Sequence, residues 1–202
     1  MAIYSFKSVK PIIDETAYVH PLACVIGEVI IGKNVYIGPF ASLRGDMGRI
    51  VVEDGGNVQD HCMIHMFQGV TVWLKKNSHI GHGAIIHGCV LEENCLVGMN
   101  AVIMDNVVIG AGSIVGAMSF VPSDKKFEAR SLIVGNPARA VREVSDQMLA
   151  WKSEGTRSYQ DLARESAKTL APCEPLKTMP PQYGLTFENP FPTWDEFKKK
   201  NP

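Results

Sequence analysis

Aliphatic side chains recur along this chain with a period of six residues. The period is interrupted by insertions of three and four residues and by one deletion, and it resumes each time in the same form. A last unit is expected to end at Val134. The row consists of Val19, Val25, Ile31, Ile37, Leu43, Val52, Val58, Ile64, Leu74, Ile80, Ile86, Leu91, Val97, Ile103, Ile109, Val115 and Val121.

A period of six fits neither an amphipathic helix nor an alternating strand. It fits short strands joined by corners, where Asn and Gly tolerate positive φ. Three units make one triangular coil, and successive coils stack at about 4.8 Å. The sequence therefore predicts an all-β solenoid, a parallel β-helix with the aliphatic row along its axis.

The expected solenoid spans residues 17–135 and follows a lead-in and cap over residues 1–16. Residues 122–131 are expected to form an exposed excursion before the closing strand. Ser145 is a good N-cap for a helix over 146–154, and Gly155 is expected to interrupt that helix or cap its C-terminus. A second helical stretch is expected over about 156–170, within a helical segment bounded by residues 136 and 171. The proline-rich residues 172–202 are expected to form an extended tail, part of which packs through Phe187, Phe191 and Trp194.

The repeat places two histidines in one column. Ile64 and Ile86 are three units apart, so they lie on the same face in successive coils. His65 and His87 follow them directly and are predicted to point outward, one above the other at about 4.8 Å. Two imidazoles at that spacing can converge on one metal ion. His82 lies on the neighbouring face and is expected to reach that point only from a second subunit, which suggests a closed trimer.

Other polar residues fall beside these histidines. Counting three units back places Arg44 in the column of His65 and Asp60 in the column of His82, with Gln59 next to Asp60. Arg44, Asp46 and Asp60 are expected either to form an interface ion-pair network or to shape the site. The remaining histidines lack support from the repeat and are expected to occupy solvent or corner positions: His20, His61 and His79.

Three short motifs carry a family resemblance: Arg44-Gly45-Asp46, Asn57-Val58-Gln59-Asp60, and His65 with Gly81-His82 and His87-Gly88. Together they resemble the γ-class carbonic anhydrases of the hexapeptide-repeat family. The resemblance implies a left-handed β-helix and a homotrimer with intersubunit metal sites. It also implies that Zn²⁺ is held by His65 and His87 of one subunit and His82 of the next. Fe²⁺ and Co²⁺ also suit such a ligand set.

The same resemblance assigns roles to the polar neighbours. Gln59 matches the residue that hydrogen-bonds metal-bound solvent, Arg44 with Asp46 and Asp60 matches the interface network, and Asn57 matches a nearby polar residue. The implied reaction is attack of metal hydroxide on CO₂.

Over about residues 1–175, including Ile133–Ala140 and Leu149–Gln160, the chain is similar to the PaaY and CaiE subgroup of that family. Met47 and the loop 66–70 lack the carboxylates of the prototype enzymes, which disfavours fast proton transfer. Three alternatives therefore stay open. The first is a PaaY-type thioesterase acting on CoA thioesters in phenylacetate catabolism, the second a metal-free hexapeptide acyltransferase, and the third a non-catalytic trimeric scaffold.

Composition and charge narrow the possible classes of function and location. The 202 residues carry a net charge of −1 without basic runs, which argues against nucleic-acid binding. No apolar run is long enough for a membrane span, and no signal-peptide pattern opens the chain, so a cytoplasmic protein is expected. The five cysteines include no CxxC pair, and Cys62, Cys89 and Cys95 occupy small inward positions of the repeat. Reduced core thiols are expected.

Overall fold

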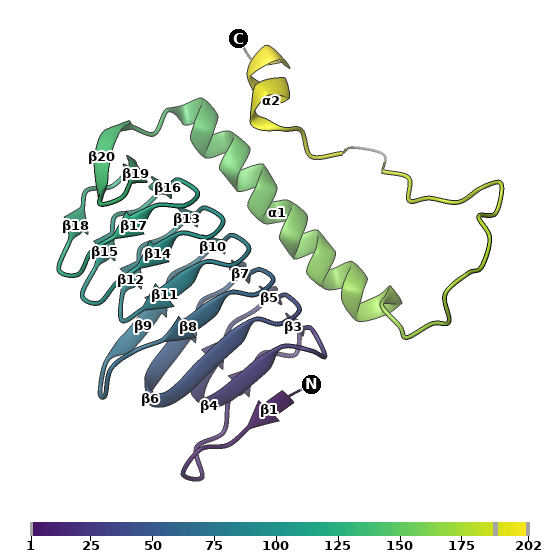
Figure 1. Cartoon of the computed structure of the whole chain (residues 1–202), viewed down its shortest axis with the longest axis horizontal. Helices are drawn as coiled ribbons and strands as arrows, with labels where there is room; N and C mark the ends of the chain where they lie inside the picture. Colours follow the sequence, from purple (N-terminus) through teal and green to yellow (C-terminus); the bar gives the residue numbers. More distant parts are fainter. Residues whose placement is uncertain (1, 188–189, 201–202) are drawn as a thin grey trace.

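A computed structural model describes residues 2–187 and 190–200 of the chain. Short parallel strands stack into a three-sided prism, a long helix runs beside it, and a tail loops away from the body before returning to the far end of that helix (Figure 1). The strands form one twelve-stranded and one eight-stranded sheet. The fold is a left-handed β-helix, as predicted.

The strands of the twelve-stranded sheet are β1 (Ala2–Tyr4), β2 (Ile12–Ile13), β4 (Cys24–Ile31), β6 (Ser42–Val52), β8 (Met63–His65), β9 (Thr71–Leu74), β11 (Ile85–His87), β12 (Val90–Leu91), β14 (Val102–Ile103), β15 (Val108–Ile109), β17 (Phe120–Val121) and β18 (Lys126–Phe127). Those of the eight-stranded sheet are β3 (Tyr18–Val19), β5 (Tyr36–Ile37), β7 (Asn57–Val58), β10 (His79–Ile80), β13 (Leu96–Val97), β16 (Ile114–Val115), β19 (Ser131–Gly135) and β20 (Ala138–Glu143). The helices are α1 (Asp146–Thr169) and α2 (Trp194–Lys200).

The aliphatic row fills the axis of the prism, as the period predicts. From Val25 to Val121 every member is at most 1% exposed, and each coil pairs in parallel with the next. The expected corner residues Asn34, Asn77 and Asn94 have φ of 52°, 58° and 58°. Burial of one large aliphatic side chain contributes about 1.5–3 kcal/mol, so this axis is the main source of stability.

The predicted excursion over residues 122–131 is wrong. Strand β18 pairs in parallel with β15, with Phe127 opposite Ile109, and β19 places Ile133 opposite Val115. The period of six therefore continues through Phe127 to Ile133. Ile133 is fully buried, so it closes the row in place of the expected Val134. An aromatic residue in an otherwise aliphatic row concealed this continuation.

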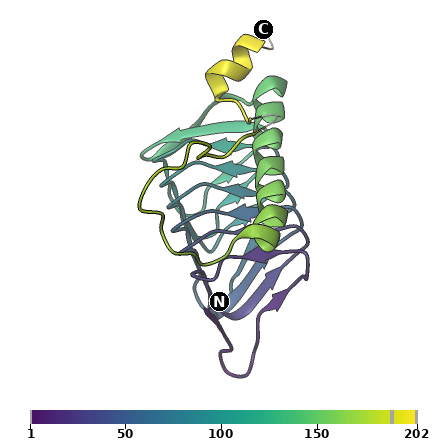
Figure 2. The same ribbon diagram turned by 90° about the vertical axis from the view of Figure 1, so that its right-hand side faces the viewer.

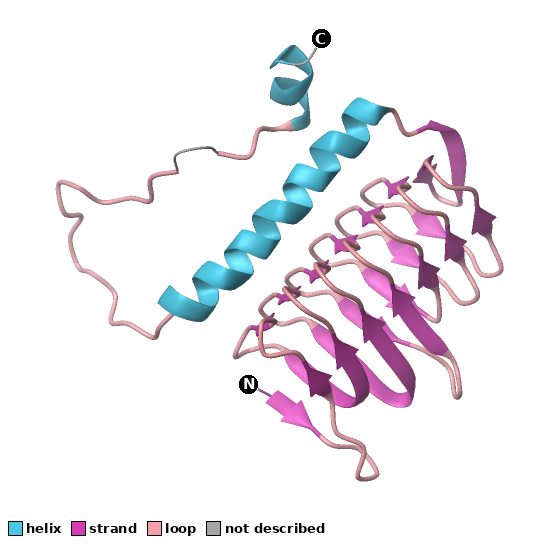
Figure 3. Ribbon diagram, turned by 180° about the vertical axis from the view of Figure 1, so that it is seen from behind, coloured by secondary structure: helices cyan, strands magenta, loops and turns pink. Residues whose placement is uncertain are grey.

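Helix α1 lies along the face formed by the eight-stranded sheet (Figures 2 and 3). Its N-cap is Ser145, whose side chain accepts a hydrogen bond from the backbone N–H of Met148, as predicted. The helix continues through Gly155, contrary to the expected interruption. A side chain at Gly155 would place its Cβ 3.1 Å from the ring of Phe191, so packing accounts for the glycine.

The tail contacts the body where it returns to α1. Phe191 stacks on Trp151 with ring centroids 5.6 Å apart, and Trp151 Nε1 donates to the carbonyl of Pro192 at 3.0 Å. Trp194 packs on Trp151 as well, whereas Phe187 is 68% exposed. Within the described parts of the chain, neither helix is long and apolar enough to cross a membrane.

Candidate functional site

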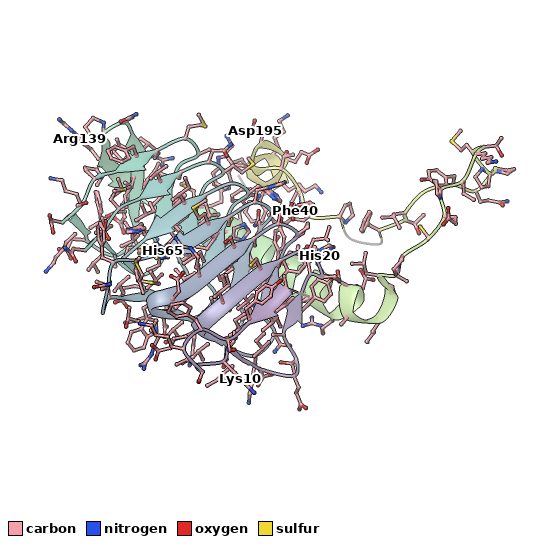
Figure 4. The ribbon with its side chains drawn as sticks, turned by 60° about the horizontal axis from the view of Figure 1, so that its bottom comes forward. Lys10, His20, Phe40, His65, Arg139 and Asp195 are labelled. Atoms are coloured by element: carbon pink, nitrogen blue, oxygen red, sulfur yellow. The ribbon has the colours of Figure 1, made fainter. Side chains whose placement is uncertain are left out.

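His65 and His87 lie one above the other, as the repeat predicts. They end strands β8 and β11, which pair in parallel with the two histidines opposite each other. Their ring centroids are 5.5 Å apart with an interplanar angle of 57°. Figure 4 shows His65 among the side chains that project from the strands of the prism. Both rings therefore face the same region outside the prism.

A carboxylate holds each of these two rings. Asp46 Oδ1 lies 3.0 Å from His65 Nε2, and Asp105 Oδ1 lies 2.7 Å from His87 Nδ1. Because carboxylate oxygens accept hydrogen bonds, each facing nitrogen carries the hydrogen. The nitrogens left with lone pairs are then Nδ1 of His65 and Nε2 of His87. Metal-binding histidines usually have such an outer carboxylate.

Arg44 joins this group through Asp46. Its Nη1 donates to Asp46 Oδ2 at 2.8 Å. Burial would raise the pKa of the Asp46 carboxyl, but the hydrogen bonds from Arg44 and His65 outweigh burial and hold the pKa below its usual range. Asp46 thus remains an ionised acceptor for His65.

Asp105 is a site residue that the predicted columns of polar residues do not include. It follows Ile103 by two residues, and Ile103 lies one coil after Ile86 and pairs with it. Extending the count by one coil would have placed Asp105 beside His87.

His82 stands at a corner, apart from the other two histidines of its own chain. Its Nδ1 lies 2.8 Å from Asp60 Oδ2, and its side chain is 45% exposed. The predicted register is confirmed, because Ile80 pairs with Val58 in the preceding coil. Among the residues that the structure describes, no three His, Cys, Asp or Glu side chains of one chain gather as a metal site. A three-histidine site would therefore need His82 from another copy.

Tyr159 of α1 contacts His82 from the other side. Its hydroxyl lies 3.3 Å from His82 Nε2, and since Asp60 holds the Nδ1 hydrogen, Nε2 is the acceptor and the hydroxyl donates. Burial, with the nearby Asp60 carboxylate, raises the pKa of Tyr159 to about 12. The hydroxyl thus stays protonated at neutral pH.

Asn57 and Gln59, which are buried, form a polar chain with the partly exposed His79 beneath α1. Gln59 Nε2 donates to Asn57 Oδ1 at 3.0 Å and to His79 Nε2 at 2.7 Å. Asn57 and Gln59 are at most 2% exposed. The Nδ2 donor of Asn57 has no hydrogen-bond partner among the described residues. The amide nitrogen of Gln59 is thus held in place, whereas Asn57 Nδ2 has no acceptor among the described residues.

The expected solvent or corner position of His79 is wrong. Thr156 of α1 lies 3.4 Å from its Nδ1, and the ring of Tyr159 packs edge-on at 5.3 Å. Burial, aided by Lys152 and His82, lowers the pKa of His79 to about 3. The repeat indicates that His79 points outward, but it does not show that α1 covers that face.

The other two histidines occupy corners, as expected. His20 Nδ1 accepts from the backbone N–H of Leu22 at 3.1 Å. His61 has a φ of 58° and stacks on Phe40 with centroids 4.9 Å apart. Neither contacts the histidine pair in the part of the chain that the structure describes.

A family model, bacterial transferase hexapeptide (six repeats), matches residues 88–123. Carnitine operon protein CaiE of Proteus sp. (strain LE138) is 51% identical over 176 residues, covering 87% of this chain and 89% of that protein. CaiE of Escherichia coli O81 (strain ED1a) is 51% identical over 179 residues, covering 89% and 91%.

Two solved structures are similar over most of their length. A hexapeptide transferase family protein from Anaplasma phagocytophilum has a TM-score of 0.78 at 32% identity, covering 81% of this chain and 96% of that one. A proposed acetyltransferase from Bacillus cereus, the product of the BC4754 gene, has a TM-score of 0.79 at 30% identity, covering 80% and 94%.

Proposed function

The chain belongs to the hexapeptide-repeat family that includes carnitine operon protein CaiE, and we propose that it is a metal-dependent enzyme of the γ-carbonic anhydrase type. In this proposal His65 and His87 of one copy and His82 of the next hold the metal. The reaction is reversible hydration of CO₂. The observation that carries the proposal is the stacked pair His65 and His87, each ring fixed by its own carboxylate.

The pair His65 and His87 fits a metal in residue type and in spacing. Two imidazoles that share a tetrahedral zinc have ring centroids about 5 Å apart, and the observed separation is 5.5 Å. Three neutral imidazoles leave a fourth position open, which is typical of catalytic zinc. A zinc ion bound there would supply a Lewis acid and lower the pKa of a bound water to about 7.

The chain's own residues would orient the reactants around that centre. Asp46 and Asp105 hold the ring hydrogens, so the free nitrogens of His65 and His87 are fixed. Asp60 holds the Nδ1 hydrogen of His82 in the same way, so the nitrogen that would face the metal is Nε2, which here accepts from the Tyr159 hydroxyl. Gln59 has its amide nitrogen fixed by Asn57 and His79, which leaves the amide oxygen to accept a hydrogen bond from the nucleophile.

The test is metal content together with CO₂ hydration by stopped flow. Wild type and the surface control His61→Ala should hold about one zinc per chain and hydrate CO₂, whereas His82→Ala should lose both properties. Full metal content and full activity in His82→Ala would refute the proposal.

A mixing experiment tests whether two copies of the chain contribute histidines to one metal site. His82→Ala retains His65 and His87, whereas His65→Ala retains His82. Neither variant should be active alone. In randomly mixed trimers about a quarter of the interfaces combine the intact halves, so activity should return to about that fraction. No recovery in assembled mixed trimers would contradict the sharing.

A second candidate, hydrolysis of CoA thioesters, is favoured by the surroundings of His87. The ring of Phe67 lies 5.1 Å from that of His87 and is 64% exposed. The loop 66–70 that carries Phe67 has no carboxylate to relay protons, and its apolar edge suits a larger substrate. A panel of acyl-CoA compounds with detection of the free thiol tests this candidate. Absence of turnover that depends on metal would remove it, and transfer of an acyl group by metal-free protein would instead indicate an acyltransferase.

A further inference from the structure

A cavity of about 460 Å³ lies between α1 and the prism face formed by β10, β13 and β16. Its floor includes three glycines from successive coils, Gly81, Gly98 and Gly116. A Cβ at Gly98 would lie 2.4 Å from the backbone nitrogen of Ala117, so close packing of the coils requires glycine there. The consequence is a floor without side chains at these positions.

The roof and the outer wall come from α1 and the tail. Trp151, Gly155 and Tyr159 project from one side of the helix, and Phe191 of the tail closes the edge. A glycine inside a helix costs about 1 kcal/mol relative to alanine, yet Gly155 is retained where a side chain would meet Phe191 at 3.1 Å. The tail is thus seated over the cavity by the contacts of Phe191 and Pro192 with Trp151.

The chemistry of the lining selects against charged ligands. None of the described residues that line the cavity is acidic. Lys152 lines it, but its Nζ already donates to the carbonyl of Asn77 at 2.6 Å and to Asn94 Oδ1 at 2.5 Å. The polar pair Tyr159 and His82 also belongs to the lining, with the hydroxyl 3.3 Å from the ring nitrogen.

We infer that this cavity is a binding site for an uncharged apolar group, an alkyl chain or an aromatic ring, whose polar end lies beside Tyr159 and His82. Small-molecule pockets typically enclose about 300–1,000 Å³, with mostly apolar walls and a few polar groups. The cavity fits that description. Nothing in the inference requires a metal ion or a reaction at the histidines.

The affinity of the cavity for a ligand should depend on the length of the ligand's alkyl chain. Each methylene buried in the cavity should lower Kd about fourfold until the cavity is full. The chain length at which Kd stops falling is the break in the series. The probes are primary amides from butanamide to decanamide, which carry one uncharged polar end. Their binding to the full chain is measured by calorimetry, both as purified and after chelation of metal.

Two matched variants locate the site. Ala117 and Ala129 are both exposed corner residues that precede a residue with positive φ, but only Ala117 lines the cavity. Ala117→Phe should shift the break in the series to shorter amides, and Ala129→Phe should leave it unchanged. Phe191→Ala, which removes the outer wall, should weaken binding of the long amides by more than fourfold.

Three outcomes would overturn the inference: a Kd that does not depend on chain length, a break that Ala117→Phe does not move, or an equal shift in both alanine variants. Amide binding in a protein that holds no metal and hydrates no CO₂ would contradict the proposed function and leave this inference standing. Activity on CO₂ without amide binding would support the proposed function and overturn this inference.

Discussion

Acidification should destabilise this protein through one imidazole that α1 covers in part, that of His79. The ring lies between β10 and α1, with Gln59 Nε2 at 2.7 Å and Thr156 Oγ1 at 3.4 Å. Lys152 and His82 face the ring and both disfavour a positive charge on it, and Tyr159 packs against it edge-on. Burial is the largest cause that lowers the pKa of His79 to about 3 from an ordinary value of 6.5.

The direction in which stability changes with pH follows from the proton bound in the folded and in the unfolded chain. Between pH 6.5 and about 3 the unfolded chain binds a proton at His79 and the folded chain does not, so the free energy of unfolding falls as the pH falls. One pH unit corresponds to about 1.4 kcal/mol for a single group. At pH 4.5 the loss relative to neutral pH is therefore about 2.7 kcal/mol.

The assay compares wild type, His79→Gln and the exposed control His61→Gln by urea unfolding of chelated protein at pH 7.5 and pH 4.5. Glutamine keeps a neutral donor and acceptor but does not titrate. Wild type and His61→Gln should lose stability equally, and His79→Gln should lose about 2.7 kcal/mol less. Asp46 and the remaining histidines are common to all three proteins and cancel. Equal losses in all three proteins would refute the reasoning.

Three further predictions concern single contacts. Asp105→Asn should weaken metal binding 10- to 100-fold because it loosens the ring of His87, as measured by competition with a chromogenic chelator; unchanged affinity would contradict the role of Asp105. Ser145→Ala should lower the free energy of unfolding by about 1 kcal/mol through loss of the cap on Met148, whereas Ser145→Gly should cost only a few tenths. Burial lowers the pKa of Lys152 to about 7, so the unfolded chain binds the extra proton between pH 7 and 10.5 and stability should rise over that interval. Lys152→Gln should flatten this rise in thermal unfolding measured from pH 7 to 10, and an unchanged slope would exclude the lysine as its source.

The prism and the histidine pair follow from the sequence because one period fixes the direction of every side chain. Each coil repeats the geometry of the previous one, so a count of units places His65 opposite His87 and Asp60 one coil before His82. The period does not predict the coil at Phe127, because the row is otherwise aliphatic and an aromatic residue stands there. Physically, the axis near the end of the prism accepts a larger ring that is only partly buried.

The position of α1 could not be obtained in this way. The helix is held by contacts between residues far apart in the chain, such as Lys152 Nζ with the carbonyl of Asn77 and with Asn94 Oδ1. Periodicity describes which residues point outward and contains no information about what covers them. For that reason the sequence predicts a solvent or corner position for His79, which the helix partly covers, and an interruption or C-cap at Gly155, which makes room for Phe191.

Tyr159 links the cavity to His82, because it lines the first and contacts the second. The Tyr159 hydroxyl donates to His82 Nε2, the nitrogen that His82 would offer to the pair in the next copy. A ligand in the cavity that accepts this hydrogen bond would free Nε2, so cavity binding should favour metal binding. Coupling between two equilibria is reciprocal. The factor by which decanamide tightens zinc binding must therefore equal the factor by which zinc tightens decanamide binding, and Tyr159→Phe should bring both factors to one.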